Sequence, residues 1–184
     1  MKDLKRTIRF GNKTIVNFVN LVKKDQELVR RLRHSSKIRK YMYSGKYISR
    51  KEHFLFIDKL KNDNKNYYWL VKCSDNEYIG VIYLNRLDLN NKHAYLGIYA
   101  DNNSPLTHKG NRLMDCLKYI SFDLLKLHTL KLEVLKDNLG AITFYKKEGF
   151  NQEGVLKEFI YKENKWQAVI VMGLISNRDR SKMR

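Results

Sequence analysis

The residue best suited to acid chemistry is Tyr145, in the stretch NLGAITFYKKEGF of residues 138–150. At about 100° per residue, Ala141, Ile142, Phe144 and Tyr145 fall within one arc of a helix, so the phenol belongs to its apolar face. A buried tyrosine at such a position either packs, with its hydroxyl hydrogen-bonded, or donates a proton to a ligand. Taken alone, the pattern favours the packing interpretation.

A second candidate for chemistry is the loop-to-helix junction PLTHKGNR at residues 105–112. The unpaired N–H groups and the dipole of a helix start favour anions. Gly110 would let a ligand approach the backbone closely, and His108, Lys109 and Arg112 add positive charge. Most such junctions bind no ligand, so this feature needs support from its surroundings.

Composition limits the classes of protein that need to be considered. The 184 residues carry a net charge of +18, which is explained by nucleic-acid binding, by small polyanionic ligands, or by a bias toward lysine and asparagine. Cys73 and Cys116 have no neighbouring His or Cys, so they are interpreted as packing residues. No apolar run reaches about 18 residues and no signal-peptide pattern is present, so a cytoplasmic protein without a membrane partner is expected.

The elements that must position these residues follow from hydrophobic periodicity and turn signals. Ser49 and Glu52 form a capping box that opens one helix. A hairpin is expected within residues 7–18, helices at 25–34, 49–60, 111–125 and 138–147, and strands at 67–73, 77–84, 93–100, 129–134, 151–162 and 166–175. This order predicts an α/β fold with a mixed sheet.

The helical stretch resembles a known family signature. NLGAITFYKKEGF matches the N-x-x-A-x-x-x-Y-x-x-x-G-F motif of the GCN5-related N-acetyltransferases (GNAT), and HAYLGIYA with the junction after it resembles that family's acetyl-CoA motif. The junction departs from the usual Q/R-x-x-G-x-G/A loop, because only the last glycine is kept. The closing hairpin is similar to that of the ribosomal-protein acetyltransferases.

The resemblance implies the GNAT fold: a central mixed, mostly antiparallel seven-stranded sheet flanked by about four helices. One GNAT domain is expected over residues 1–176, followed by a basic tail at 177–184. It also implies acetyl-CoA as co-substrate and no metal, with a homodimer left open.

The implied chemistry is direct attack of an acceptor amine on a thioester, which requires a base for the amine and an acid for the thiolate. The family signature makes Tyr145 the acid. For the base we favour Glu133, acting through a water, with His53, His93 and His34 as competitors.

The residues expected to bind acetyl-CoA lie on strand 93–100, at the junction, and in the motif helix. Asn138 would hold the cofactor, and the edge of the strand would pair with pantetheine. The full set is Leu96, Gly97, Ile98, Tyr99, His108, Lys109, Gly110, Asn111, Arg112, Asn138, Ala141 and Phe144.

A narrower resemblance concerns the acceptor. The stretches RHSSKIRKYMYS and HFLFIDKLKN resemble the family branch that acetylates the 4-amino group of a UDP-linked 4-amino-4,6-dideoxy sugar in pseudaminic acid biosynthesis, a route to flagellin glycosylation. Arginines would meet the diphosphate, and aromatic side chains would cover the rings. The implied substrate residues are Arg33, Met42, Tyr43, His53, Phe56, Asn85, Arg86 and Tyr95.

Two other functions remain open at this stage. A protein N-terminal acetyltransferase of the ribosomal type fits the closing hairpin, although a peptide site would be expected to carry more carboxylates. A nucleic-acid-binding module would need its basic residues on one face, and the sequence shows no such block.

Overall fold

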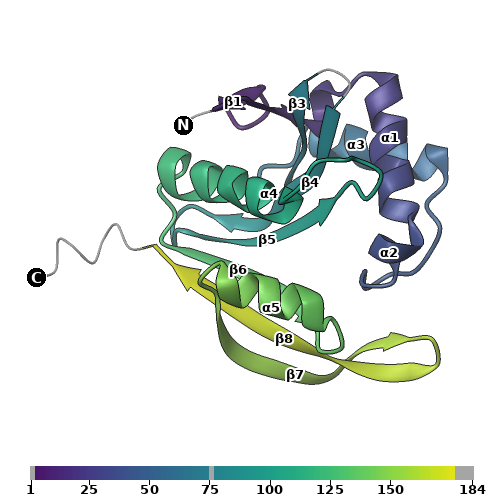
Figure 1. The fold of residues 1–184 in the computed structure, drawn as a ribbon, viewed down its shortest axis with the longest axis vertical. Helices are drawn as coiled ribbons and strands as arrows, with labels where there is room; N and C mark the ends of the chain where they lie inside the picture. Colours follow the sequence, from purple (N-terminus) through teal and green to yellow (C-terminus); the bar gives the residue numbers. More distant parts are fainter. Residues whose placement is uncertain (1–2, 75–76, 177–184) are drawn as a thin grey trace, which may run out of the picture.

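The computed structural model describes residues 3–74 and 77–176. Within these residues the chain forms one eight-stranded sheet in the order β1-β2-β3-β4-β5-β6-β8-β7 (Figure 1). All neighbours are antiparallel except β5 and β6. The strands are β1 Ile8–Phe10, β2 Lys13–Asn17, β3 Tyr67–Ser74, β4 Glu77–Asp88, β5 His93–Ala100, β6 Thr129–Leu135, β7 Asn151–Lys162 and β8 Lys165–Ile175.

Five α-helices surround the sheet in the described part of the chain. They are α1 Lys23–His34, α2 Ser36–Arg39, α3 Arg50–Leu60, α4 Lys109–Lys118 and α5 Leu139–Lys147, with a short 3₁₀ turn at Phe18–Asn20. The capping box expected at the start of α3 is present, since Glu52 and Ser49 bond each other's backbone N–H groups. Asn138 caps α5 by accepting from the Ala141 N–H.

The mixed α/β class and the strand order are confirmed, but two counts were wrong. Eight strands form instead of seven, because β2 pairs with β3 and joins the N-terminal hairpin to the main sheet. Five α-helices form where about four were expected, since the one-turn α2 follows α1. The helix expected at 111–125 starts at Lys109 and continues after Lys118 as a π-helix over Tyr119–Leu124.

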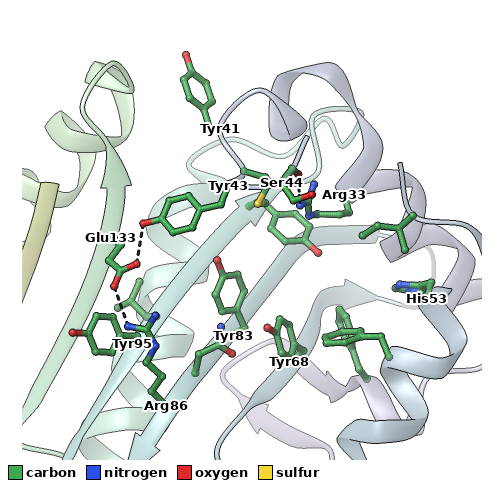
Figure 2. Close-up of a pocket in the computed structure, with 17 residues that line it drawn as sticks. Arg33, Tyr41, Tyr43, Ser44, His53, Tyr68, Tyr83, Arg86, Tyr95 and Glu133 are labelled. Atoms are coloured by element: carbon green, nitrogen blue, oxygen red, sulfur yellow. Dashed lines mark hydrogen bonds and ion pairs between the residues drawn. The ribbon is translucent and has the colours of Figure 1, made fainter. Parts of the chain in front are cut away.

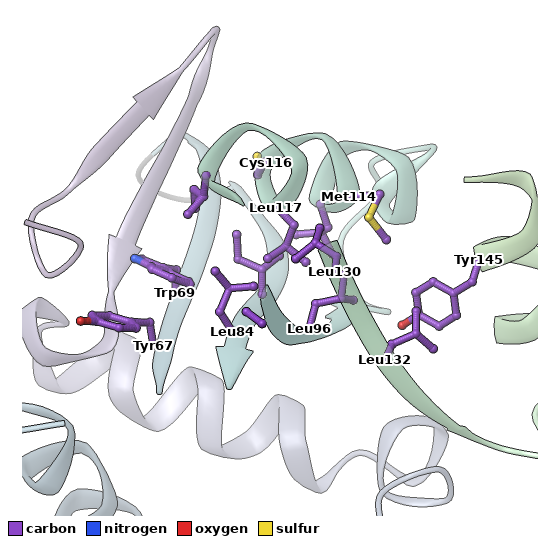
Figure 3. Close-up of a cluster of buried hydrophobic side chains, with 14 of the residues drawn as sticks. Tyr67, Trp69, Leu84, Leu96, Met114, Cys116, Leu117, Leu130, Leu132 and Tyr145 are labelled. Carbon is purple, nitrogen blue, oxygen red and sulfur yellow. The ribbon is translucent and has the colours of Figure 1, made fainter. Parts of the chain in front are cut away.

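The two faces of the sheet carry separate cores, because neighbouring residues of a strand point to opposite faces. On one face, α4 packs Leu113, Met114 and Leu117 against strands β3–β6 (Figure 3). On the other, α1 and α3 pack against Leu70 and Val81. Residue parity along β3, β4 and β5 therefore decides which side chains face α1 and α3.

Three composition-based expectations can be compared with the structure. Cys116 is buried and Cys73 is half-buried, both as free thiols. Across residues 3–74 and 77–176, no helix has the length and apolar character needed to cross a membrane, and no cluster of three metal-ligating side chains forms. The strands of the sheet extend from Ile8 to Ile175. The expectation of one domain over residues 1–176 stays a prediction, and the basic tail expected at 177–184 lies outside the described residues.

Candidate active site

The sheet opens between β5 and β6. These parallel strands pair only from His93 to Tyr95 and from Thr129 to Lys131, after which they diverge (Figure 1). A pocket of about 560 Å³ lies in the opening. We term it the β5–β6 pocket, and its main walls are residues 96–100 of β5, residues 133–135 of β6, and Asn138, Gly140, Ala141 and Tyr145 around α5.

Half of the residues expected to bind the cofactor line this pocket. They are Leu96, Gly97, Ile98, Tyr99, Asn138 and Ala141. Since β5 has no strand partner beyond Tyr95 on this side, its backbone N–H and C=O groups are available to an extended ligand.

The other six lie outside the pocket, at the start of α4 and on α5. His108 precedes α4 with a left-handed backbone, φ 52°. Lys109 donates to the Ser104 carbonyl at 2.6 Å, Asn111 donates to the Glu148 carboxylate at 2.8 Å, and Arg112 contacts the Cys73 Sγ at 3.8 Å. The side chains of Lys109, Asn111 and Arg112 therefore contact other protein groups. An anion at the junction would be bound by the backbone N–H groups at the start of α4.

Gly110 has a packing role that the sequence did not indicate. A Cβ added there would lie 3.1 Å from the Phe144 ring. The ring of Phe144 packs over Gly110 and against Tyr145, at 5.4 Å between ring centroids. This contact joins α5 to α4, and cofactor binding by Phe144 and Gly110 stays a prediction.

Tyr145 packs in the core and also lines the β5–β6 pocket. Its ring packs edge-on against Phe150 at 5.7 Å and belongs to the core (Figure 3). Its hydroxyl makes no hydrogen bond to any described residue, although the side chain is only 8% exposed and lines the β5–β6 pocket. Burial raises the pKa of Tyr145, so the phenol keeps its proton at neutral pH. It is a packed tyrosine with a free acid group.

A second pocket, of about 440 Å³, lies on the face of the sheet covered by α1 and α3 (Figure 2). We term it the tyrosine pocket. All eight residues expected to bind the acceptor line it, and they come from four different elements and the segment after α2. The remaining lining residues are Phe18, Tyr41, Ser44, Ile48, Tyr68, Tyr83, Leu96, Tyr99 and Glu133.

Tyr68 and Tyr83 were missed as lining residues. They are cross-strand partners on β3 and β4, stacked at 5.1 Å between centroids. Tyr83 also lies opposite Gly97 of β5, and its ring occupies the space where a side chain at Gly97 would be. Burial raises the pKa of Tyr83 to about 12. The sequence did contain a signal for Tyr83. It lies two residues before the predicted Asn85 on β4, so both side chains point to the same face of the sheet.

Glu133 connects the two pockets, because it lines both. Its carboxylate accepts from the Tyr43 hydroxyl at 2.8 Å and from Arg86 Nη1 at 3.0 Å (Figure 2). Only 14% of its side chain is exposed. Burial, with the bond to Glu133, raises the pKa of Tyr43, so Tyr43 remains a donor. Glu133 therefore places a carboxylate between the two pockets, where ligands bound in them would be in contact.

The three competing histidines are less favourably placed to act as a base. His34 accepts from the Ile48 N–H at 2.9 Å and stacks on Tyr47, and His93 lies beside Asp88 at 3.9 Å; neither lines a pocket. His53 does line the tyrosine pocket, but its Nε2 is 3.0 Å from the Gln26 carbonyl. Burial lowers the pKa of both His34 and His53.

Positive charge exceeds negative charge among the described residues of the tyrosine pocket. Arg33 and Arg86 both line it, and its one carboxylate, Glu133, already pairs with Arg86. Arg33 donates through Nη2 to the Ser44 carbonyl at 3.1 Å, while its buried Nη1 has no partner in the described structure. Burial lowers the pKa of Arg33, although a guanidinium stays charged at neutral pH. The pocket therefore suits an aromatic or sugar ring that carries negative charge.

Comparison with known proteins identifies the architecture. Residues 19–171 match the family described as "Acetyltransferase (GNAT) domain". Acetyltransferase PseH of Campylobacter jejuni is 34% identical over 145 residues, covering 79% of this chain and 88% of the relative.

Two solved structures can be compared with the whole chain. The crystal structure of C. jejuni N-acetyltransferase PseH is 28% identical, with a TM-score of 0.67 over 90% of this chain and 99% of the other. The fold is also that of the Vibrio cholerae spermidine N-acetyltransferase solved with CoA and spermine, with a TM-score of 0.80, 23% identity, and coverage of 90% and 96%.

Proposed function

Because the chain belongs to the GNAT family and is an acetyl-CoA-dependent N-acetyltransferase, we propose that its acceptor is the 4-amino group of a UDP-linked amino-deoxy sugar in the pseudaminic acid pathway. A cytoplasmic site of action, without nucleic-acid or membrane partners, is part of the same proposal. The similarity to acetyltransferase PseH over most of the chain supports this assignment.

The observation that carries the proposal is the charge and shape of the tyrosine pocket. Two guanidinium groups and several aromatic rings line it, and its one carboxylate is already paired. A nucleotide sugar presents a diphosphate to arginine and flat rings to aromatic side chains. A polyamine or a peptide ammonium would require unpaired carboxylates instead. The same argument disfavours the ribosomal type of N-terminal acetyltransferase.

The proposed mechanism divides the work between the two pockets. Acetyl-CoA supplies an acetyl thioester, which residues 96–100, Asn138 and Ala141 would hold in the β5–β6 pocket. The amine nitrogen bonds to the carbonyl carbon, and the carbon–sulfur bond then breaks. Glu133 takes a proton from the amine, through a water, and Tyr145 gives its proton to the departing thiolate. Both transfers leave the products neutral at nitrogen and sulfur.

The deciding experiment measures CoA release from acetyl-CoA with three acceptors: a UDP-4-amino-4,6-dideoxy sugar, spermidine, and a ribosomal-protein N-terminal peptide. We expect turnover with the nucleotide sugar alone. Binding should also raise the melting temperature in the presence of that sugar, since a ligand of the native state stabilises it by mass action. Turnover with the peptide or spermidine, and none with the sugar, would show that the acceptor is wrong.

A further inference from the structure

The boundary between the two pockets is formed in part by an irregular segment, residues 40–48, that connects α2 to α3. We term this segment the strap. Tyr41 and Met42 line both pockets, and Tyr43, Ser44 and Ile48 line the tyrosine pocket. The position of the strap backbone therefore sets the shape of the space in which an amine would approach a thioester.

The second half of the strap is fixed by α1. Arg33 donates to the Ser44 carbonyl at 3.1 Å, and Arg30 donates to the Ile48 carbonyl at 3.2 Å. His34 accepts from the Ile48 N–H at 2.9 Å. These contacts reach residues 44–48 and leave the first half, with Tyr41 and Met42, to be held by another element.

That element is the β7–β8 hairpin, through Lys162. Its ammonium group donates to three backbone carbonyls, those of Arg39 at 3.3 Å, Lys40 at 2.6 Å and Met42 at 3.1 Å. An ammonium has three N–H donors, so every donor is used. A cation at the last turn of α2 is also favoured by the helix dipole.

The hairpin end is well suited to hold this ammonium in place. Lys162 is the last residue of β7 and pairs with Lys165 across a two-residue turn. Both turn residues, Glu163 and Asn164, have positive φ, at 52° and 59°, as tight hairpin turns require. A second contact comes from Phe159 of β7, whose ring meets Tyr43 edge-on at 6.3 Å.

We propose that Lys162 is a positioning residue for acetyl transfer. By holding the carbonyls of residues 39–42, it fixes Tyr41 and Met42 at the junction of the pockets and so aligns the acceptor amine with the thioester. This role rests on the proposed function only in placing the acceptor in the tyrosine pocket, and it holds for any amine that enters there.

The test compares Lys162→Met with Lys165→Met. Methionine keeps the length and apolar stem of lysine and removes its donors. Lys165 is exposed and lies on the same hairpin, and its side chain makes no hydrogen bond to the described residues. For Lys162→Met we expect the KM for the acceptor to rise about 10-fold, since charge-assisted hydrogen bonds are lost at a half-exposed site. The Kd for acetyl-CoA and the melting temperature should stay near wild type, and Lys162→Arg should restore part of the loss.

A second measurement requires no acceptor. Chymotrypsin cleavage after Tyr41 or Tyr43 should accelerate several-fold in Lys162→Met and not in Lys165→Met, because the first half of the strap is released. If the nucleotide sugar is not the acceptor, this result still stands and separates the two proposals. An unchanged acceptor KM with unchanged cleavage would overturn the role of Lys162. Equal losses of acetyl-CoA affinity and melting temperature would also overturn it, by showing a general structural role.

Discussion

At the scale of single residues, Tyr145 carries the sharpest prediction. Its hydroxyl has no hydrogen-bond partner among the described residues and its ring packs in the core, so Tyr145→Phe removes an acid while leaving the packing intact. We expect turnover to fall about 10- to 1000-fold, a range consistent with the loss of a general acid, with little change in acetyl-CoA affinity. Steady-state kinetics with isothermal titration of acetyl-CoA provides the measurement. Unchanged turnover would leave Tyr145 a packing residue only.

Glu133 needs a test that separates basicity from its structural bonds to Tyr43 and Arg86. Glu133→Gln keeps the size and an acceptor oxygen but removes the charge, so we expect kcat to fall about 100-fold. Tyr43→Phe removes one bond to Glu133 and keeps the carboxylate, so its kcat should change less than about 10-fold. If both variants lose activity equally, Glu133 acts by holding Tyr43, and the base is another group.

The residues expected to contact the acceptor show what a sequence can provide. Resemblance identified eight positions that the structure brings into one pocket, although they span Arg33 to Tyr95 in the chain. Tyr68 and Tyr83 were missed because the alternation of residues along a strand shows which residues share a face of the sheet. It does not show which face carries a pocket. For Phe144 and Gly110 the motif predicts cofactor contact, and it gives no sign that the two residues also pack against each other.

At the scale of elements, the pairing of β4 with β5 depends on Gly97. The Tyr83 ring lies where a side chain at position 97 would be. Gly97→Ala should therefore displace Tyr83, with a loss of about 1–3 kcal/mol of folding stability, as in overpacked cores. Denaturant unfolding of Gly97→Ala, Tyr83→Ala and the double variant checks this. The double variant should recover most of the loss caused by alanine at 97, and strict additivity would contradict a direct clash.

Helix boundaries show why some elements could not be predicted. The apolar pattern after Gly110 continues smoothly past Lys118, so it gives no sign of the change to a π-helix at Tyr119–Leu124. The attachments of the strap could not be foreseen from the sequence either. Lys162 is 120 residues from Met42 and is one of many lysines in a chain with 37 basic residues.

At the scale of the whole molecule, the net charge of +18 has to be distinguished from the charge of the tyrosine pocket. The tyrosine pocket contains Arg33 and Arg86, and its Glu133 carboxylate is already paired with Arg86. A scattered surplus of lysine would attract any polyanion weakly, whereas this pocket places guanidinium groups beside aromatic walls. The excess charge of the chain and the charge of the pocket are thus separate features, and only the second bears on the acceptor.

The stability of the whole fold should depend on pH through the buried His53 and the half-buried His34. Burial lowers the pKa of His34 and His53 below the ordinary value near 6.5, with Arg30 acting in the same direction on both. The unfolded chain therefore binds more protons than the folded one as pH falls below about 6.5, and stability must fall with it. Carboxylates follow at lower pH, since the bond from Arg30 lowers the pKa of Glu27 to about 2.

Melting temperature measured from pH 8 to pH 5 checks this dependence. We expect a plateau above pH 7 and a decline below about 6.5, together with loss of activity, because protonated His34 cannot accept from the Ile48 N–H that anchors the strap. His34→Gln keeps an acceptor and removes the titration, so it should flatten part of the decline. A melting temperature that is constant across this range would contradict the burial argument for both histidines.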